Sequence, residues 1–256
     1  MKLDHVTSRD NPALVRLRKI AADPGGYRKT GSVWIEGDHL LRAALQRGWR
    51  PALVVITEAA MQDAVLGALT ESAARVLVVP APLFKTLSGL ESPAQIGAEL
   101  TLPVAPAIDA QAASVVLDRL QDAGNVGAIL RSAAAFGVRQ VLALKGTAAL
   151  WSSKVVRAGQ GAHFGLRLIE GLAADDLGAL TVPLVATSSH DSQPLHRVAL
   201  PSPCAWVMGH EGQGVSADLM ARCALRVGIP QPGGEESLNV AAAAAICLYE
   251  SERQRG

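Results

Sequence analysis

The chain has 256 residues, of which 49% are hydrophobic and 18% charged, so it can bury one large or two modest cores and is not a disordered chain. Its formal net charge of +1 provides no global basic field that would attract nucleic acid. The three cysteines (Cys204, Cys223 and Cys247) lie in apolar runs without short paired spacing. They exclude a disulfide framework and indicate buried thiols in a reducing compartment.

The amino terminus lacks the apolar stretch of a signal peptide, and its early Asp4 argues against a transit peptide. No apolar run approaches the ~20 residues that span a bilayer. We therefore expect a soluble, cytoplasmic protein.

The amino-terminal hundred residues alternate between helical and extended patterns. Asp10 or Asn11 is a suitable cap ahead of Pro12, where a first helix is expected to begin. Helices are predicted over 11–22, 38–47 and 59–72, and strands over 32–37, 53–56 and 76–79. This alternation predicts a small α/β unit with a parallel or mixed sheet.

Residues 102–113 carry two prolines among small residues and show no clear periodicity. We place a linker over 101–113, between a domain at 1–100 and a second at 114–256. In the second domain, strands are predicted over 114–118, 140–144, 182–187 and 205–208, and helices over 126–136, 153–159, 217–224 and 238–253. This domain is predicted to be α/β with a mostly parallel sheet.

Basic residues outnumber acidic ones between Arg9 and Arg50. The excess is compatible with a solvated helical face and equally with a surface that contacts a series of phosphates. Composition does not separate the two.

A first candidate site follows the strand that ends at Asp118. Gly124 permits a tight turn and Asn125 is a good N-cap. Arg131 lies among apolar helix residues, so we expect it to need an anionic partner, because an unpaired buried charge is costly. In the alternative interpretation, Asn125 only caps the helix and Arg131 is solvated.

A second candidate site is the glycine-rich loop from Gly209 to Ser216. No Lys-Ser/Thr pair follows it, as a P-loop requires, and the glycine spacing does not fit a dinucleotide fingerprint. Glu211 would repel a pyrophosphate and suits a cationic or hydroxyl-bearing ligand better. The alternative is a plain turn with a solvated Glu211.

A third candidate site runs from Ile229 to Val240. Ser237 is a natural N-cap for the last helix, whereas Asn239, inside the predicted first turn, is less easily explained by capping. Thr187, at the end of a predicted strand, is placed to complete a small-molecule pocket with the two loops. His190, His196 and His210 have no metal-ligand spacing, so no metal site is expected.

At these sites the sequence resembles the SpoU (TrmH-type) RNA 2′-O-ribose methyltransferases of the SPOUT superfamily. The family's three motifs are matched in order by Asn125 with Arg131, by Gly209-His210-Glu211-Gly212, and by Ser237-Leu238-Asn239-Val240. A weaker match, through 8–12 and 35–37, links the amino-terminal half to the family's substrate-binding domain. Ala123, His210 and Ala241 depart from the usual proline, asparagine and serine.

The resemblance implies a deep trefoil knot, an exception to the usual avoidance of knots. It also implies S-adenosylmethionine as cofactor and a homodimer whose site is completed across the interface. The cofactor-binding residues expected from it are Thr187, Gly209, Glu211, Gly212, Gly214, Ile229, Pro230, Ser237 and Leu238.

The implied reaction is methyl transfer to a ribose 2′-hydroxyl. Because guanidinium is almost never deprotonated in proteins, we expect Arg131 to bind the adjacent phosphate or stabilise the developing alkoxide. The other expected catalytic residues, which orient Arg131 and the ribose, are Asn125, Glu211, Ser237 and Asn239. The candidate RNA contacts are Arg9, Asn11, Arg16, Arg18 and Arg28.

Ribosomal RNA is favoured as substrate because of the additional amino-terminal domain. Transfer RNA stays open as an alternative. A non-catalytic RNA-binding or assembly protein with the same fold is the alternative from another class.

Overall fold

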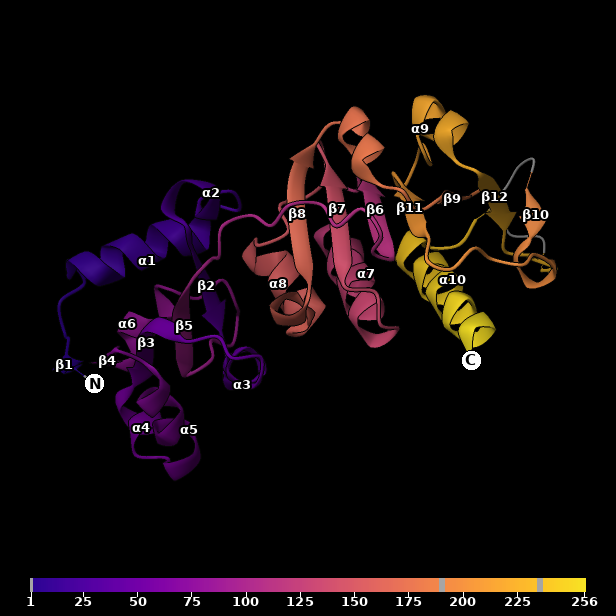
Figure 1. The fold of residues 1–256 in the computed structure, drawn as a ribbon. Helices are drawn as coiled ribbons and strands as arrows, with labels where there is room; N and C mark the ends of the chain where they lie inside the picture. Colours follow the sequence, from indigo (N-terminus) through magenta and orange to yellow (C-terminus); the bar gives the residue numbers. More distant parts are fainter. Residues whose placement is uncertain (1, 189–191, 234–236) are drawn as a thin grey trace. The chain divides into compact units, whose positions relative to one another are not determined.

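The structure is a computed structural model that describes residues 2–188, 192–233 and 237–256. The chain divides into two compact units (Figure 1). Unit 1 comprises Met1–Val104 and Trp151–Phe164, and unit 2 comprises Ala105–Leu150 and Gly165–Gly256. None of the helices in the described ranges has the length and apolar character that crossing a bilayer requires.

Unit 1 contains a five-stranded mixed sheet with the order β1-β4-β3-β5-β2. Its strands are β1 (Lys2–His5), β2 (Ser32–Glu36), β3 (Pro51–Thr57), β4 (Arg75–Val79) and β5 (Ile96–Thr101). Strand β4 runs parallel to β1 and β3, whereas β5 is antiparallel to β3 and β2. Neither β1 nor β5 was expected from the sequence.

The helices of unit 1 are α1 (Pro12–Ala22), α2 (Tyr27–Thr30), α3 (Asp38–Gln46), α4 (Glu58–Met61), α5 (Ala64–Leu69), α6 (Ala81–Lys85) and α8 (Ser153–Gly159). Asn11 caps α1, as one of the two predicted caps, by accepting a 3.0 Å hydrogen bond from the Ala13 amide. The prediction of a single helix over 59–72 is wrong. The Asp63 carboxylate accepts from the amides of Val65 and Leu66 at 2.8 and 2.9 Å and so starts a separate helix.

One buried cluster lies between α1 and the sheet, where Leu14 and Leu17 pack with Val55 and Leu77. A cluster of aromatic side chains joins the Trp151–Phe164 segment to the rest of unit 1. The Trp49 indole donates to the Phe164 carbonyl at 3.1 Å, and its ring lies 5.6 Å from that of Trp151. This segment is flanked in sequence by residues of unit 2 but packs within unit 1.

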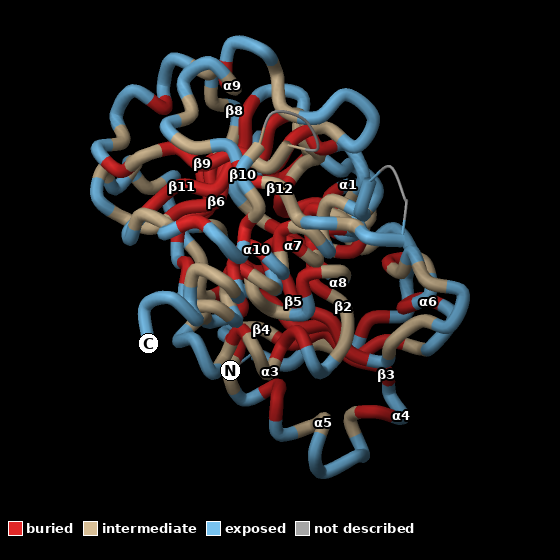
Figure 2. Tube along the Cα trace, turned by 90° about the vertical axis from the view of Figure 1, so that its right-hand side faces the viewer, coloured by how far each residue is buried: buried red, intermediate tan, exposed pale blue. Residues whose placement is uncertain are grey.

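Unit 2 contains a seven-stranded sheet with the order β10-β12-β9-β11-β6-β7-β8. Its strands are β6 (Ser114–Asp118), β7 (Gln140–Leu144), β8 (Arg167–Leu172), β9 (Leu184–Thr187), β10 (Gln193–Pro194), β11 (Ala205–Gly209) and β12 (Leu225–Gly228). The pairings between these strands are parallel, which confirms the predicted sheet. Strands β6, β7 and β11 are buried along their whole length, as parallel strands covered on both faces are (Figure 2).

The helices of unit 2 are α7 (Ala123–Ala135), α9 (Ala217–Arg222) and α10 (Val240–Arg255), and α7 packs beside α10 (Figure 1). Both predicted caps in this unit are wrong. The Asp122 carboxylate caps α7 by accepting from the Asn125 amide at 2.7 Å. The Asn239 side chain, not Ser237, caps α10. In each case a different polar residue near the predicted cap begins the helix, and its side chain accepts from amides of the first turn.

Because these strands are parallel, β6, β9, β11 and β12 end at the same edge of the sheet, where ligands bind in open α/β folds. The segments after β6, β9, β11 and β12 contain the three motifs identified from the sequence. The trefoil knot stays a prediction.

Candidate functional site

A cavity of about 1040 Å³ lies at this edge of the unit 2 sheet. Every residue expected to bind the cofactor lines it, together with Asn125 and Asn239. Arg131 does not line it. The other lining residues, which were not singled out as cofactor-binding or catalytic residues, are Ser188, Ser192, Pro194, His210, Gln213, Val215, Met220, Val227, Gly228, Gln231, Val240 and Ala243.

The loop after β11 folds back on itself through close backbone contact. The amide of His210 donates to the Gly214 carbonyl at 3.0 Å, and the amide of Gly214 donates back at 2.8 Å. A Cβ atom on Gly209 would lie 2.2 Å from backbone atoms of Gly214 and Val215, so no side chain fits there. Glycine is therefore required at position 209 by the packing of the loop itself.

The side chain of His210 also stabilises this loop. Its Nδ1 atom accepts from the amides of Gly212 and Gln213 at 3.0 and 3.3 Å. The Oδ1 atom of asparagine, the usual residue here in the family it resembles, is an acceptor the same number of bonds from Cα. The histidine at position 210 therefore keeps the hydrogen-bond acceptor that the usual asparagine would supply.

The Glu211 carboxylate is held by donors from the segment after β6. It accepts from the amides of Gln121 and Asp122 at 3.2 and 3.0 Å and from the Asn125 side chain at 3.3 Å. Burial acts to raise the Glu211 pKa, but hydrogen bonds from its own amide, Asp122, Gln121 and Asn125 outweigh it and hold the pKa below its usual value. Its acceptors are thus directed to the protein, whereas the sequence suggested a cationic or hydroxyl ligand.

Asn125 and Asn239 connect this loop to the last helix. The Asn239 side-chain amide donates to Asn125 Oδ1 at 2.9 Å, while its own Oδ1 accepts from the amides of Ala241 and Ala242. Since Asp122 caps α7, the Asn125 side chain is available for both Glu211 and Asn239. A continuous chain of hydrogen bonds therefore joins all three motifs.

Arg131 is exposed on α7, so the expectation that it is a buried cation in need of a partner is wrong. The apolar positions around it, such as Ile129 and Leu130, face the core, while Arg131 lies on the outer face. At about 100° and 1.5 Å per residue, the side chains of Asn125 and Arg131 point roughly 120° apart and lie about 9 Å apart along the axis. Within one chain the two do not converge.

A further glycine was missed at the end of β12. A Cβ on Gly228 would lie 2.4 Å from Ser192 Oγ and 3.2 Å from the Ser188 carbonyl. Ser192 in turn donates to that carbonyl at 3.0 Å. The signal in the sequence was a glycine directly before Ile229-Pro230, which ends its strand as Gly209 ends β11.

Of the RNA contacts expected in unit 1, Arg16 is instead bound within the protein. Its guanidinium pairs with both carboxylate oxygens of Glu99, with Nη2 to Oε2 at 2.7 Å. The Glu99 side chain is only 3% exposed. The hydrogen bond with Glu99 raises the Arg16 pKa. Arg16 is therefore a structural partner of a buried carboxylate.

The other expected RNA contacts differ in the interactions that they make within the protein. Arg18 donates to the Arg9 carbonyl at 2.6 Å and lies 3.4 Å from the Thr86 hydroxyl. The Arg28 guanidinium lies 5.2 Å from the centroid of the Tyr27 ring. Asn11 is the cap of α1. Arg9 and Arg28 are exposed cations.

Replacement of Arg16 by methionine is expected to lower the free energy of unfolding by roughly 2 kcal/mol, because it leaves Glu99 buried without its charge partner. The half-exposed arginine reduces the effect below that of a fully buried pair. Urea unfolding measures it, and the double variant Arg16→Met with Glu99→Leu should recover most of the loss. Unchanged stability with weaker RNA binding would instead restore Arg16 as a phosphate contact.

No cluster of metal-ligating side chains is found in the described parts of the chain, and His190 lies outside them. The three cysteines are free thiols. Cys204 and Cys247 are buried, as expected, whereas Cys223 is partly exposed. Burial raises the pKa of Cys247 to about 12 and those of Cys204 and Cys223 to about 11, so these thiols are unreactive at neutral pH.

Comparison with known proteins gives consistent matches over nearly the whole chain. Residues 112–249 match the SpoU rRNA Methylase family, and residues 26–98 match the MRM3-like substrate binding domain. The chain is 31% identical to the 23S rRNA (guanosine(2553)-2′-O)-methyltransferase RlmP of Bacillus subtilis, over 86% of this chain and 88% of that protein. It is 30% identical to an uncharacterised tRNA/rRNA methyltransferase of Synechocystis, over 98% and 94%.

A crystal structure of an AdoMet-bound rRNA methyltransferase from Sinorhizobium meliloti is similar over 98% of both chains, with a TM-score of 0.85 and 28% identity. The agreement covers both units and includes the segments that form the cavity. The chain belongs to the SpoU rRNA methylase family.

Proposed function

We propose that this protein is an S-adenosylmethionine-dependent 2′-O-ribose methyltransferase that acts on ribosomal RNA. The observation that carries the proposal is the hydrogen-bonded chain from Glu211 through Asn125 to Asn239 at the edge of the cavity. Family membership and the similarity to RlmP support both the reaction and the substrate.

The residues present fit the cofactor. The cavity is lined by residues of the loops that start at Gly209 and Ile229, and Leu238 adds an exposed apolar surface. A concave site with apolar walls and a few polar groups suits an adenosine group. When bound, S-adenosylmethionine supplies an electrophilic methyl group. We assign its retention to these loops, with Thr187, Glu211 and Ser237 at the polar positions.

The chain's own residues must bring the ribose hydroxyl to that methyl group. Asn125 and Asn239, held by Glu211 and by the α10 cap, are fixed orienting groups for the ribose. Arg131 keeps its proton and binds the adjacent phosphate or stabilises the developing alkoxide. The proton leaves to solvent as the hydroxyl attacks.

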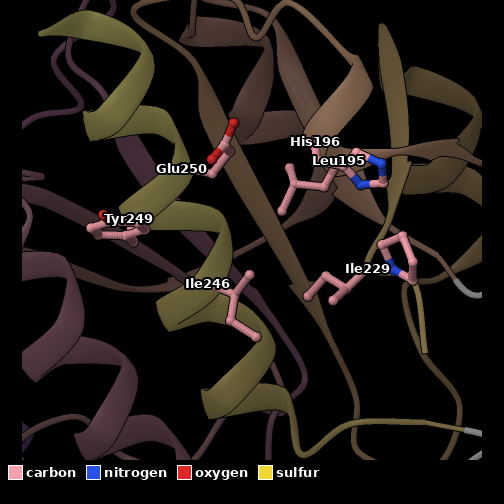
Figure 3. A pocket seen from close by; sticks show the side chains of 7 residues that line it. Leu195, His196, Ile229, Ile246, Tyr249 and Glu250 are labelled. Carbon is pink, nitrogen blue, oxygen red and sulfur yellow. The ribbon is translucent and has the colours of Figure 1, made fainter. Parts of the chain in front are cut away.

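Because Arg131 is exposed and does not line the cavity of its own chain, we propose that a second copy supplies it and that the active form is a homodimer. The exposed parts of α7 and α10 form the interface. Apolar side chains are exposed on α10, where Ile246 and Tyr249 are 40% and 56% accessible. Figure 3 shows Ile246 and Ile229 pointing toward one another across a small groove beside α10.

We assign RNA substrate binding to unit 1, with exposed Arg9 and Arg28 as phosphate contacts. The match of residues 26–98 to a substrate-binding domain supports this assignment. We also propose a cytoplasmic location, which the similarity to a bacterial rRNA methyltransferase supports.

The test is transfer of tritiated methyl groups from S-adenosylmethionine onto unmodified ribosomal RNA and bulk transfer RNA in separate reactions. Label in ribosomal RNA alone, resistant to alkali at the modified linkage, is the expected result. An Arg131→Ala preparation controls for contaminating enzymes. Label in transfer RNA alone would overturn the substrate, and cofactor binding without label in either pool would favour a non-catalytic RNA-binding or assembly protein.

A further inference from the structure

Arg119, directly after β6, has an unusual backbone conformation. Its φ of 60° lies in the left-handed region, which strains any residue with a Cβ atom. The other described non-glycine residue with positive φ, Gln160, is simply the carboxyl-terminal cap of α8. Arg119 caps no helix. The strain at Arg119 therefore calls for a separate explanation.

That conformation lets Arg119 bind two groups at once. Its Nε donates to Asp118 Oδ1 at 2.9 Å, and its Nη1 donates to Gln213 Oε1 at 3.0 Å. The second oxygen of Asp118 accepts from the Ser216 amide at 2.7 Å. Asp118 and Arg119 thus attach both Gln213 and Ser216 to the end of β6.

The surroundings of Arg119 are arranged to accept it. Gly146, with a φ of 94°, lies opposite, and a Cβ there would stand 3.3 Å from Arg119 Cγ. Asp118 is buried, with 1% exposure, so its carboxylate is a fixed anchor for the guanidinium. Charge-assisted bonds of this kind hold geometry better than neutral ones.

We propose that Arg119 is a positioning residue that fixes the 209–216 loop in the shape that receives the methyl donor, and that the strained backbone is retained for this purpose. The inference rests on the proposed function for the identity of the ligand. It extends the site beyond the cavity lining, because Arg119 itself does not line the cavity.

The test compares Arg119→Gly with Arg119→Ala. Both remove the guanidinium, but only glycine relieves the strain, so the glycine variant should have the higher thermal midpoint. Both should bind S-adenosylhomocysteine roughly tenfold more weakly than the wild type, and equally so. The proposal is wrong if the variant with the higher thermal midpoint also binds S-adenosylhomocysteine more tightly. It is also wrong if either variant binds this ligand as tightly as the wild type does.

Gln213→Ala removes the acceptor while leaving Arg119 in place. It should weaken S-adenosylhomocysteine binding as much as Arg119→Ala does. The thermal midpoint should change little, because Gln213 is exposed. The double variant Arg119→Ala with Gln213→Ala should bind S-adenosylhomocysteine no more weakly than either single variant. Each substitution breaks the same contact between Arg119 and Gln213. Fully additive losses would contradict the proposal.

A measurement without ligand separates this inference from the proposed function. Amide exchange at Gly214 and Ser216 reports whether the loop is held, whatever binds there. It should be roughly tenfold faster in both Arg119 variants, and unchanged exchange would overturn the positioning role. Failure of the wild type to bind S-adenosylhomocysteine would count against the proposed cofactor alone.

Discussion

Gly209→Ala is expected to weaken S-adenosylhomocysteine binding by roughly 100-fold, because overpacking at this site has no flexible neighbour to absorb it. The new methyl group would lie 2.2 Å from backbone atoms of Gly214 and Val215. Relief requires the loop to open and the paired hydrogen bonds between His210 and Gly214 to break. Isothermal titration calorimetry measures the loss directly.

Gly212→Ala is the matched control in the same loop. A Cβ there meets only the His210 ring, at 3.9 Å, and the position has no positive φ. Because Gly212 lines the cavity, its affinity for S-adenosylhomocysteine should fall a few-fold, far less than the loss expected for Gly209→Ala. Equal affinity of the two variants would show that the close approach at Gly209 is not needed for binding.

Arg131→Ala is expected to reduce turnover by roughly 100-fold to 1000-fold, the usual cost of losing a group that stabilises transition-state charge. Cofactor affinity and thermal midpoint should change little, because Arg131 is exposed and lies outside the cavity. Arg131→Lys should not restore turnover, since lysine lacks the planar fork. Near-normal turnover of the lysine variant, with unchanged RNA binding, would exclude a bidentate role.

The two variants together test whether the site is shared between chains. In a mixed dimer, the Arg131→Ala chain keeps an intact cavity and the Gly209→Ala chain keeps an intact Arg131. Random mixing gives about half mixed dimers with one intact site each, so about a quarter of wild-type activity should return. No recovery in dimers shown to have exchanged subunits would place Arg131 in its own chain's site.

The fold class was predictable because strand and helix patterns are local. Strands β6 and β7 are nearly continuous apolar runs, and both were predicted within their observed bounds. Edge strands such as β1 and β10 are short and partly exposed, so their sequences carry little signal. Their pairing depends on partners far along the chain.

The site was predictable in its location but not in its internal contacts. Loops after parallel strands collect at one edge, which is why Thr187, Gly209 and Ile229 were correctly grouped around one cavity. The position of Arg131 was misjudged, because an apolar neighbourhood in sequence does not say which face of a helix is buried. Arg16 was misjudged for a different reason, because its partner Glu99 lies on β5, a strand that was not expected.

The parallel order β9-β11-β6 also governs when the pocket comes into existence during translation. Strand β6 is made early, and one of its edges stays open until β11 is synthesised and inserted beside it. The bond between Asn125 and Asn239 spans 114 residues and closes only when α10 has begun. Open strand edges on nascent chains invite aggregation. Chains stopped before β11 should therefore accumulate as insoluble material, and the methyl donor should stabilise only chains that extend into α10.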